Sequence, residues 1–348
     1  MILAGDIGGT NARLAYFQPQ NGHLRLISER VFPSREHKEF GEIVNQFLQD
    51  SGTRPDAACF GIAGPVRNGR VETSNLPWVI EQSRLAKQIH LPATLLINDL
   101  EASAWGIGIL AASDMVPLNH VSGPAVGNQA VIAPGTGLGE AGLFWDGSRH
   151  HVFACEGGHT DFGPQGDLQI ELVRFLKARF GHVSYERILS GPGLVNVYEF
   201  LRDSGCGKES PEFAAALQKG DAAAAISRAA LDGTQSLAEQ ALDLWIAVYA
   251  AEAANLALKV MATGGLFLAG GISPKILAKL TGPIFMQSFV AKGRMRSLME
   301  SIPVQVITND KAGLLGAARC AALRGSPLDR ELDPAPGPVP GKDMSEIA

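Results

Sequence analysis

The feature that most constrains this chain is a glycine-rich turn between two apolar runs, and the chain carries it twice. The first turn, Gly8-Gly9-Thr10, follows the apolar run that starts at Ile2 and precedes one that ends at Phe17. The second turn, Gly135-Thr136-Gly137, has the same setting. Each pattern predicts a β-hairpin whose tip lacks bulky side chains, so that backbone N–H groups of the turn can bind an anion. Two copies indicate two related halves that serve one ligand.

Asp6 stands just before the first turn. A carboxylate beside phosphate groups acts mainly as a holder of Mg²⁺ or of its water shell, so the pattern favours a nucleotide-dependent phosphotransferase. For either hairpin alone, the alternative is a tight turn in which glycine only supplies a positive φ. Neither turn fits the Walker sequence or the dinucleotide-binding glycine pattern, because both of those open a helix and here the chain returns as a strand.

Composition narrows the class of protein further. With 348 residues, of which 46% are hydrophobic and 19% charged, the chain is long enough for two domain cores. The net charge of −5 and the lack of a basic run argue against nucleic acid or an anionic membrane as partner. The sequence indicates no bilayer-spanning stretch and no leader before Ile2, which predicts a cytoplasmic protein. The four cysteines lack the spacing of a zinc site or a disulfide framework.

Apolar periodicity predicts alternating helices and strands, which is typical of a buried sheet flanked by helices. The apolar helix at 237–261 is expected to end at Thr263-Gly264-Gly265, where glycine can adopt the left-handed cap. The Pro-rich, acidic segment 325–348 is expected to be disordered. The expected helices are 40–48, 80–89, 100–110, 169–180, 193–201, 211–217, 221–230, 237–261, 275–280 and 312–324, and the expected strands beyond the hairpins are 57–63, 94–97, 266–269 and 304–308.

Asp99 follows the expected buried strand 94–97, and the carboxyl end of such a strand is where ligands meet an open α/β sheet. A carboxylate there can orient an attacking hydroxyl and accept its proton, which is most of what phosphoryl transfer needs from a base. Asp99 is therefore the candidate base. The alternative is that Asn98-Asp99 caps the helix starting at Leu100, although capping by one residue does not exclude catalysis by the other.

The loop Glu156-Gly157-Gly158-His159 combines two glycines with two polar side chains that can face a small ligand. Sugar hydroxyls both donate and accept hydrogen bonds, so a hexose site favours carboxylates together with a histidine or an amide. Glu156, His159 and Glu186 meet that need. For Glu186 the alternative, favoured on these residues alone, is an exposed helical ion pair with Arg187.

Six segments in this order resemble the bacterial ATP-dependent glucokinase family, and together they span nearly everything up to Arg324. A related family of sugar kinases and repressors has three closely spaced cysteines after its own Glu-x-Gly-His motif, and this chain has none there. The six segments are Asp6 to Arg13, Ile97-Asn98-Asp99, Pro134 to Gly139, Glu156 to Phe162, Gly181 to Gly191 and Ala269-Gly270-Gly271-Ile272.

The resemblance implies an α/β fold of two ribonuclease-H-like domains, the actin-like ATPase fold, with ATP in the cleft between them. It implies a small domain at 1–108, completed by the C-terminal helix 310–324, and a large domain at 109–309. It assigns glucose hydroxyl contacts to Asn98, Asp99, Glu156, His159 and Glu186, and places Asn75 nearby. ATP is expected at Gly5, Asp6, Ile7, Gly8, Gly9, Thr10, Gly135, Thr136, Gly270 and Gly271, with Mg²⁺ reaching Asp6 through water.

The activity that the resemblance implies is transfer of the γ-phosphate of MgATP to the 6-hydroxyl of glucose, the entry step of glycolysis. The nearest alternative is a kinase for another hexose, such as mannose, fructose or an N-acetylated amino sugar. A non-catalytic sugar sensor is an alternative of another class. The sequence leaves open the phosphoryl donor, since ATP, polyphosphate and ADP differ by loop details, and also the oligomeric state, since the helix at 237–261 would allow a homodimer.

Overall fold

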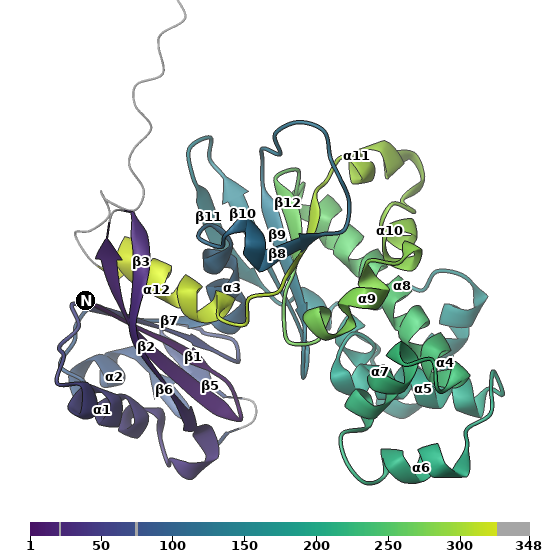
Figure 1. Cartoon of the computed structure of the whole chain (residues 1–348), viewed down its shortest axis with the longest axis horizontal. Helices are drawn as coiled ribbons and strands as arrows, with labels where there is room; N and C mark the ends of the chain where they lie inside the picture. The colour runs from purple at the N-terminus through teal and green to yellow at the C-terminus, as the bar shows by residue number, and fades with distance from the viewer. Residues whose placement is uncertain (21, 74–75, 326–348) are drawn as a thin grey trace, which may run out of the picture. The chain divides into compact units, whose positions relative to one another are not determined.

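The computed structural model describes residues 1–20, 22–73 and 76–325, and the chain divides into two compact units (Figure 1). Within the described residues, unit 1 comprises 1–105, 146–150 and the chain from Leu314 onward, and unit 2 comprises 106–145 and 151–313. Asn75, expected near the sugar, and the tail beyond Gly325, expected to be disordered, lie outside the described residues.

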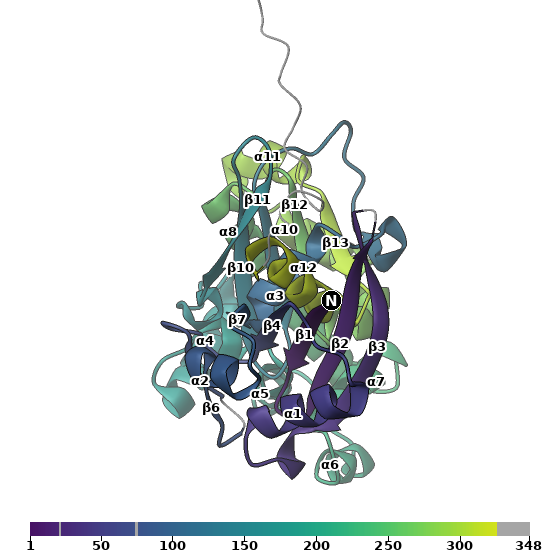
Figure 2. The ribbon, with the colours of Figure 1, turned by 90° about the vertical axis from the view of Figure 1, so that its left-hand side faces the viewer.

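Unit 1 is built on a five-stranded sheet in the order β3-β2-β1-β4-β7. Strands β1, β4 and β7 run parallel, and the expected first hairpin is confirmed by the antiparallel pairing of β1 with β2. Helices α1 and α2 cover one face of the sheet, and α3 and α12 the other (Figures 1 and 2). The elements are β1 (Ile2–Ile7), β2 (Asn11–Gln20), β3 (His23–Pro33), α1 (Phe40–Ser51), β4 (Ala57–Ile62), β5 (Arg70–Glu72), β6 (Val79–Glu81), α2 (Gln82–Gln88), β7 (Thr94–Asn98), α3 (Asp99–Ile107) and α12 (Ala312–Gly325).

One apolar stripe attaches α1 to the sheet, as its periodicity predicts. Phe40, Ile43, Val44 and Phe47 are all buried, and the ring of Phe40 packs edge-on against Phe60 of β4 with their centroids 5.0 Å apart. Each such side chain buried from water contributes about 1.5–3 kcal/mol to folding. The helix therefore forms because the sheet covers its apolar face.

The helix expected at 80–89 begins later than predicted. Val79–Glu81 form the short strand β6, which pairs with β5 so that Ile80 lies opposite Val71 and both side chains are buried. The helix α2 starts only at Gln82. The apolar Ile80 fits either a helix or a strand, and its pairing with β5 decides for the strand.

Unit 2 contains a six-stranded sheet in the order β11-β10-β9-β12-β13-β8. The expected second hairpin is confirmed by the antiparallel pairing of β9 with β10, and β12 runs parallel to β9 and β13. Helix α8 packs against the sheet and against α5, α7 and α10. The elements are β8 (Met115–Pro117), β9 (Gln129–Pro134), β10 (Leu138–Trp145), β11 (His150–Cys155), α4 (Asp167–Phe180), α5 (Gly191–Asp203), α6 (Pro211–Leu217), α7 (Ala222–Leu231), α8 (Ser236–Val260), β12 (Gly265–Leu268), α9 (Leu277–Leu280), α10 (Pro283–Phe289), α11 (Arg296–Glu300) and β13 (Val304–Ile307).

Helix α8 corrects two expectations. By length and composition it could cross a membrane, contrary to the sequence analysis, but 67% of its most apolar window is buried inside the structure, as in the core helix of a globular domain. Its left-handed cap is Met261, with φ 52°, and not a glycine of the 263–265 segment. Gly264 instead packs against the backbone of Gly127, so closely that a Cβ atom on Gly264 would come 2.4 Å from the Gly127 oxygen.

Candidate functional site

Three parallel strands of unit 1 end side by side. Ile7 of β1 pairs with Ile62 of β4, and Ile62 pairs with Asn98 of β7. The turn after β1 therefore begins two strand spacings, about 10 Å, from the end of β7. This edge, where the carboxyl ends of parallel strands meet, is the edge at which open α/β sheets bind ligands. Asp6, at the end of β1, and Asp99, after β7, are both half-buried there.

Asn98 and Asp99 have different local roles. The Asn98 Oδ1 atom accepts the Leu100 N–H at 2.8 Å, and its Nδ2 atom donates to the Gly64 carbonyl at 3.0 Å. Asn98 is thus the N-cap of α3, as the alternative in the sequence analysis foresaw, and it ties the helix to the chain beyond β4. Asp99 is the first residue of α3, and its Oδ1 atom accepts the same N–H at 2.9 Å. Helix N-termini favour negative charge, so this position suits a carboxylate.

Each glycine-rich turn is closed by the N–H of its own first glycine. The Gly8 N–H donates to the Asn11 carbonyl at 2.9 Å, and the Gly135 N–H donates to the Gly137 carbonyl at 2.8 Å. These two N–H groups were expected to serve an anion, but they hold the turns in shape. The donors that the turns can offer are therefore those of the residues that follow, such as Thr10 and Thr136.

Gly5 and Ile7 lie inside unit 1. A Cβ atom at position 5 would come 2.6 Å from Cδ1 of Phe60 and 2.8 Å from Cδ2 of Leu14, so packing requires glycine there. The Ile7 side chain is 2% exposed and belongs to the apolar core. Neither residue therefore offers a side chain to a ligand.

Unit 2 brings His159 and Glu186 together, from the short helical turns η3 (Gly157–His159) and η4 (Tyr185–Arg187). Oε1 of Glu186 lies 4.0 Å from Nδ1 of His159, and Oε2 accepts the Leu138 N–H at 3.0 Å, directly after the second glycine turn. The Arg187 guanidinium lies over the ring of Phe180, 4.4 Å from its centroid. The structure thus shows the Glu186 carboxylate in contact with His159 and the turn, in place of the ion pair with Arg187 that the sequence alone favoured.

Glu156 directly precedes η3, and its side chain is exposed, as is that of His159. The two glycines between them are required by packing against β10. A Cβ atom at position 157 would come 1.8 Å from Oε2 of Glu140, and one at position 158 would come 2.1 Å from the Leu138 carbonyl oxygen. The glycines therefore let the loop lie flat on the strand, which leaves Glu156 and His159 on its outer side.

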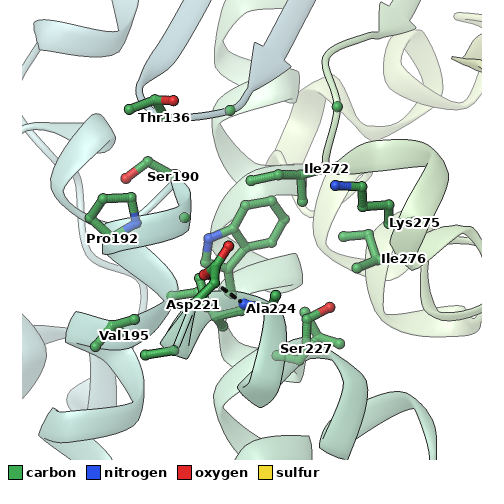
Figure 3. Close-up of a pocket in the computed structure, with 18 residues that line it drawn as sticks. Thr136, Ser190, Pro192, Val195, Asp221, Ala224, Ser227, Ile272, Lys275 and Ile276 are labelled. Carbon is green, nitrogen blue, oxygen red and sulfur yellow. Dashed lines mark hydrogen bonds between the residues drawn. The ribbon is translucent and has the colours of Figure 1, made fainter. Parts of the chain in front are cut away.

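A pocket of about 500 Å³ lies in unit 2 next to the second turn (Figure 3). Three of the residues expected to bind ATP line this pocket, namely Gly135, Thr136 and Gly271. Gly270 has a φ of 79° and sits beside the end of β9, where a Cβ atom would come 2.6 Å from the Pro134 carbonyl oxygen. The lining residues that the sequence analysis missed include Ser190, Asp221, Trp245 and Lys275.

Two of the missed residues carry a local signal. Ser190 is the N-cap of α5 and accepts the Gly193 N–H at 3.0 Å, and Asp221 is the N-cap of α7 and accepts the Ala224 N–H at 3.0 Å. A serine or aspartate before a helical run is a known start signal, but it does not reveal that two helices begin at one pocket. Trp245 comes from the middle of α8, and nothing local distinguishes it from a core residue.

Comparison with known protein families identifies the family of this chain. A glucokinase family model matches residues 3–324. The chain belongs to the glucokinase family. It is 42% identical over 338 residues to the glucokinase of a Nostoc species, covering 92% of this chain and 99% of that one. It is 41% identical over 346 residues to the glucokinase of a Synechocystis species, covering 92% and 98% of the two chains.

Solved structures agree with this assignment. A glucokinase from an Antarctic psychrotroph is 30% identical with a TM-score of 0.79, covering 92% of this chain and 98% of that one. A ROK family glucokinase from Streptomyces griseus, solved with glucose and AMPPNP, has a TM-score of 0.61 at 23% identity, covering 92% and 98% of the two chains, and so shows the fold alone. The resemblance drawn from the six segments and the expected α/β fold class of the actin-like ATPases are confirmed.

Proposed function

We propose that this member of the glucokinase family transfers the γ-phosphate of MgATP to the 6-hydroxyl of glucose, giving glucose 6-phosphate and ADP. The observation that carries the proposal is the edge of the unit 1 sheet, where Asp99 follows one strand and the Asp6 turn follows another two strands away. Family membership supports glucose as the acceptor. A cytoplasmic location and a place at the entry of glycolysis belong to the same proposal.

Asp99 acts in this reaction as the base. It accepts the proton of the 6-hydroxyl while the bond from O6 to the γ-phosphorus forms and the bond from that phosphorus to the bridging oxygen of ADP breaks. The proton leaves late in a loose transition state, so orientation of the hydroxyl matters as much as proton affinity. The hydrogen bond from the Leu100 N–H to Oδ1 of Asp99 helps to hold the carboxylate in place, and a fixed carboxylate in turn orients the hydroxyl.

The sugar hydroxyls are assigned to Glu156, His159 and Glu186, with Asn98 and the undescribed Asn75 as further contacts. The carboxylates accept hydrogen bonds from sugar hydroxyls, and the imidazole can donate one. The 4.0 Å separation of His159 from Glu186 supports this set, because one hydroxyl can contact both groups.

The pocket of unit 2 fits the nucleotide. Its walls combine the indole of Trp245 with small residues, and two helices, α5 and α7, begin at its rim. A flat base matches the apolar wall, and helix N-termini favour phosphate. Asp6 would hold Mg²⁺ through water, and the ion would neutralise charge on the phosphate oxygens.

The deciding experiment measures ADP formation with MgATP across glucose, mannose, fructose, N-acetylglucosamine and N-acetylmannosamine, with a no-sugar control. We expect glucose-dependent ADP release that Asp99→Asn lowers by about 10²–10⁴-fold in kcat while glucose still binds. Asp56→Asn, the same change at a side chain 72% exposed, is the matched control and is expected to keep wild-type turnover. Near-normal turnover of Asp99→Asn would remove Asp99 as the base. Release with another sugar alone, or sugar binding without release, would replace glucose phosphorylation by one of the two alternatives.

A further inference from the structure

Tyr185 joins η3 and η4, the two short turns that carry proposed sugar contacts. Its backbone N–H, in η4, donates to the Thr160 carbonyl at 3.1 Å, directly after η3. Its ring packs edge-on against Phe162 with the centroids 5.5 Å apart, and its hydroxyl accepts the Gly163 N–H at 3.3 Å. One residue of η4 therefore contacts the segment that follows η3 at three places.

These contacts lie next to both sugar-binding side chains of the two turns. His159 directly precedes Thr160, and Glu186 directly follows Tyr185. Nδ1 of His159 and Oε1 of Glu186 are 4.0 Å apart. A shift of Tyr185 relative to Thr160 therefore changes the separation of the two groups that would contact one sugar hydroxyl.

The Tyr185 hydroxyl is itself held from α8. Nδ2 of Asn255 donates to it at 2.9 Å, and donates also to Oε2 of Glu252, one helical turn earlier, at 2.9 Å. A hydroxyl oxygen has two lone pairs, and the N–H groups of Asn255 and Gly163 use both. Burial, followed by the charge of Glu252, raises the pKa of Tyr185, so the hydroxyl stays protonated at neutral pH. The hydroxyl therefore links the loop to α8 through two hydrogen bonds.

The contacts of the Asn255 amide select one of its two orientations. Its Oδ1 atom accepts from Nζ of Lys292, which also donates to the Ala251 carbonyl at 3.0 Å. Turned over, the amide would place its oxygen against a carboxyl oxygen of Glu252, which is fully buried, and its N–H groups against an ammonium group. Both contacts are repulsive and would leave buried polar groups unpaired. The amide therefore presents its donor to the Tyr185 hydroxyl.

We propose that Tyr185 and Asn255 are positioning residues that hold His159 and Glu186 at the separation that binds sugar. The hydrogen bond between Tyr185 and Asn255 anchors η4 to α8, and the other contacts of Tyr185 carry this anchor to the segment that follows η3. The inference rests on the proposed sugar contacts of His159 and Glu186. It assigns no contact with sugar or nucleotide to Tyr185, which is 3% exposed, or to Asn255.

The test is the steady-state kinetics of Tyr185→Phe, which keeps the ring against Phe162 and removes only the hydroxyl. The N–H groups of Gly163 and Asn255 then lose their acceptor, and η4 is no longer tied to α8 through this side chain. We expect the KM for glucose to rise about tenfold, while kcat at saturating glucose and the KM for ATP stay near the wild-type values. An unchanged KM for glucose, or an equal rise of the KM for ATP, overturns the inference.

Tyr198→Phe is the matched control for general stability. Tyr198 of α5 is 1% exposed, and its hydroxyl donates to Oε1 of Glu209 at 2.8 Å, so the variant loses a similar hydrogen bond outside the two turns. We expect both variants to lower the melting temperature, and Tyr198→Phe to leave the KM for glucose unchanged. An equal rise of this KM in both variants would assign Tyr185 a purely structural role.

A double variant tests the link between Tyr185 and Asn255. Asn255→Ala removes the amide donor, and we expect it to raise the KM for glucose on its own. Because the two residues act through one hydrogen bond, Tyr185→Phe should raise this KM by a smaller factor in the Asn255→Ala background than in wild type. Equal factors in the two backgrounds would show that hydroxyl and amide act separately, and would overturn the link.

Failure of the inference and failure of the proposed function give different results. If His159→Ala and Glu186→Gln leave the KM for glucose unchanged, the proposed sugar site is wrong whatever Tyr185 does, and the inference falls with it. If both variants weaken glucose use but Tyr185→Phe behaves as wild type, only the positioning role is wrong.

Discussion

The tight contact between Gly157 and Glu140, beneath the candidate sugar-binding loop, predicts the effect of Gly157→Ala. The added Cβ atom would lie 1.8 Å from Oε2 and 2.6 Å from Cδ of Glu140, whereas ordinary van der Waals contact begins at 3.4 Å. The loop or the buried glutamate must therefore shift by roughly 1.6 Å at this contact. Overpacking of this kind costs about 1–3 kcal/mol of stability. Misplacement of binding groups by about 1 Å can cost around 10²-fold in rate, so we expect kcat/KM for glucose to fall by about 10–100-fold.

The assay is steady-state ADP formation over a range of glucose concentrations, with thermal unfolding of the same protein. Gly220→Ala is the matched control, because a Cβ atom at position 220 meets nothing within 4 Å and its activity should stay at the wild-type level. Most of the loss in Gly157→Ala should appear in the KM for glucose and not in the KM for ATP. A Gly157→Ala enzyme with wild-type kcat/KM and wild-type melting temperature would refute the argument that the loop lies directly on Glu140.

Two further predictions concern stability. Met261→Gly should raise the free energy of unfolding in urea by about 1 kcal/mol, because Met261 is half exposed and holds a φ of 52° that glycine adopts without strain. Met261→Ala, which keeps the Cβ atom, should give no such gain. An equal gain in both variants would contradict the strain argument. Because the folded pKa of Glu140 is raised from 4.5 to about 8, its contribution to stability is complete below pH 4.5 and is lost as the pH rises through 8, by at most about 1.4 kcal/mol per pH unit. Urea unfolding at several values between pH 5 and 8 should show a shallower decline for Glu140→Gln than for wild type, and parallel curves would count against a proton on Glu140.

Elements whose formation depends on nearby residues could be predicted from the sequence. The two glycine turns between apolar runs predicted both hairpins, and the stripe from Phe40 to Phe47 predicted α1, because short-range turn chemistry and helical periodicity are visible in a short window. The position of Asn98-Asp99 at the carboxyl end of β7 likewise indicated a candidate ligand site. The order of the six matching segments was enough to indicate the family. The edge strand β3 was missed because its side chains are mostly exposed and show no alternation of buried and exposed positions.

The tertiary structure alone decided what each residue does in its place. Ile80 became a strand residue through its pairing with Val71, and Met261 took the left-handed cap, whereas Gly264 packs against the distant backbone of Gly127. Gly157 proved to be required by a buried carboxyl group, and burial, followed by the charge of Glu252 from a distant part of the sequence, raises the pKa of Glu140. Burial, close packing and the interaction of buried charges are set by neighbours that only the folded chain brings together, so no local pattern could reveal them.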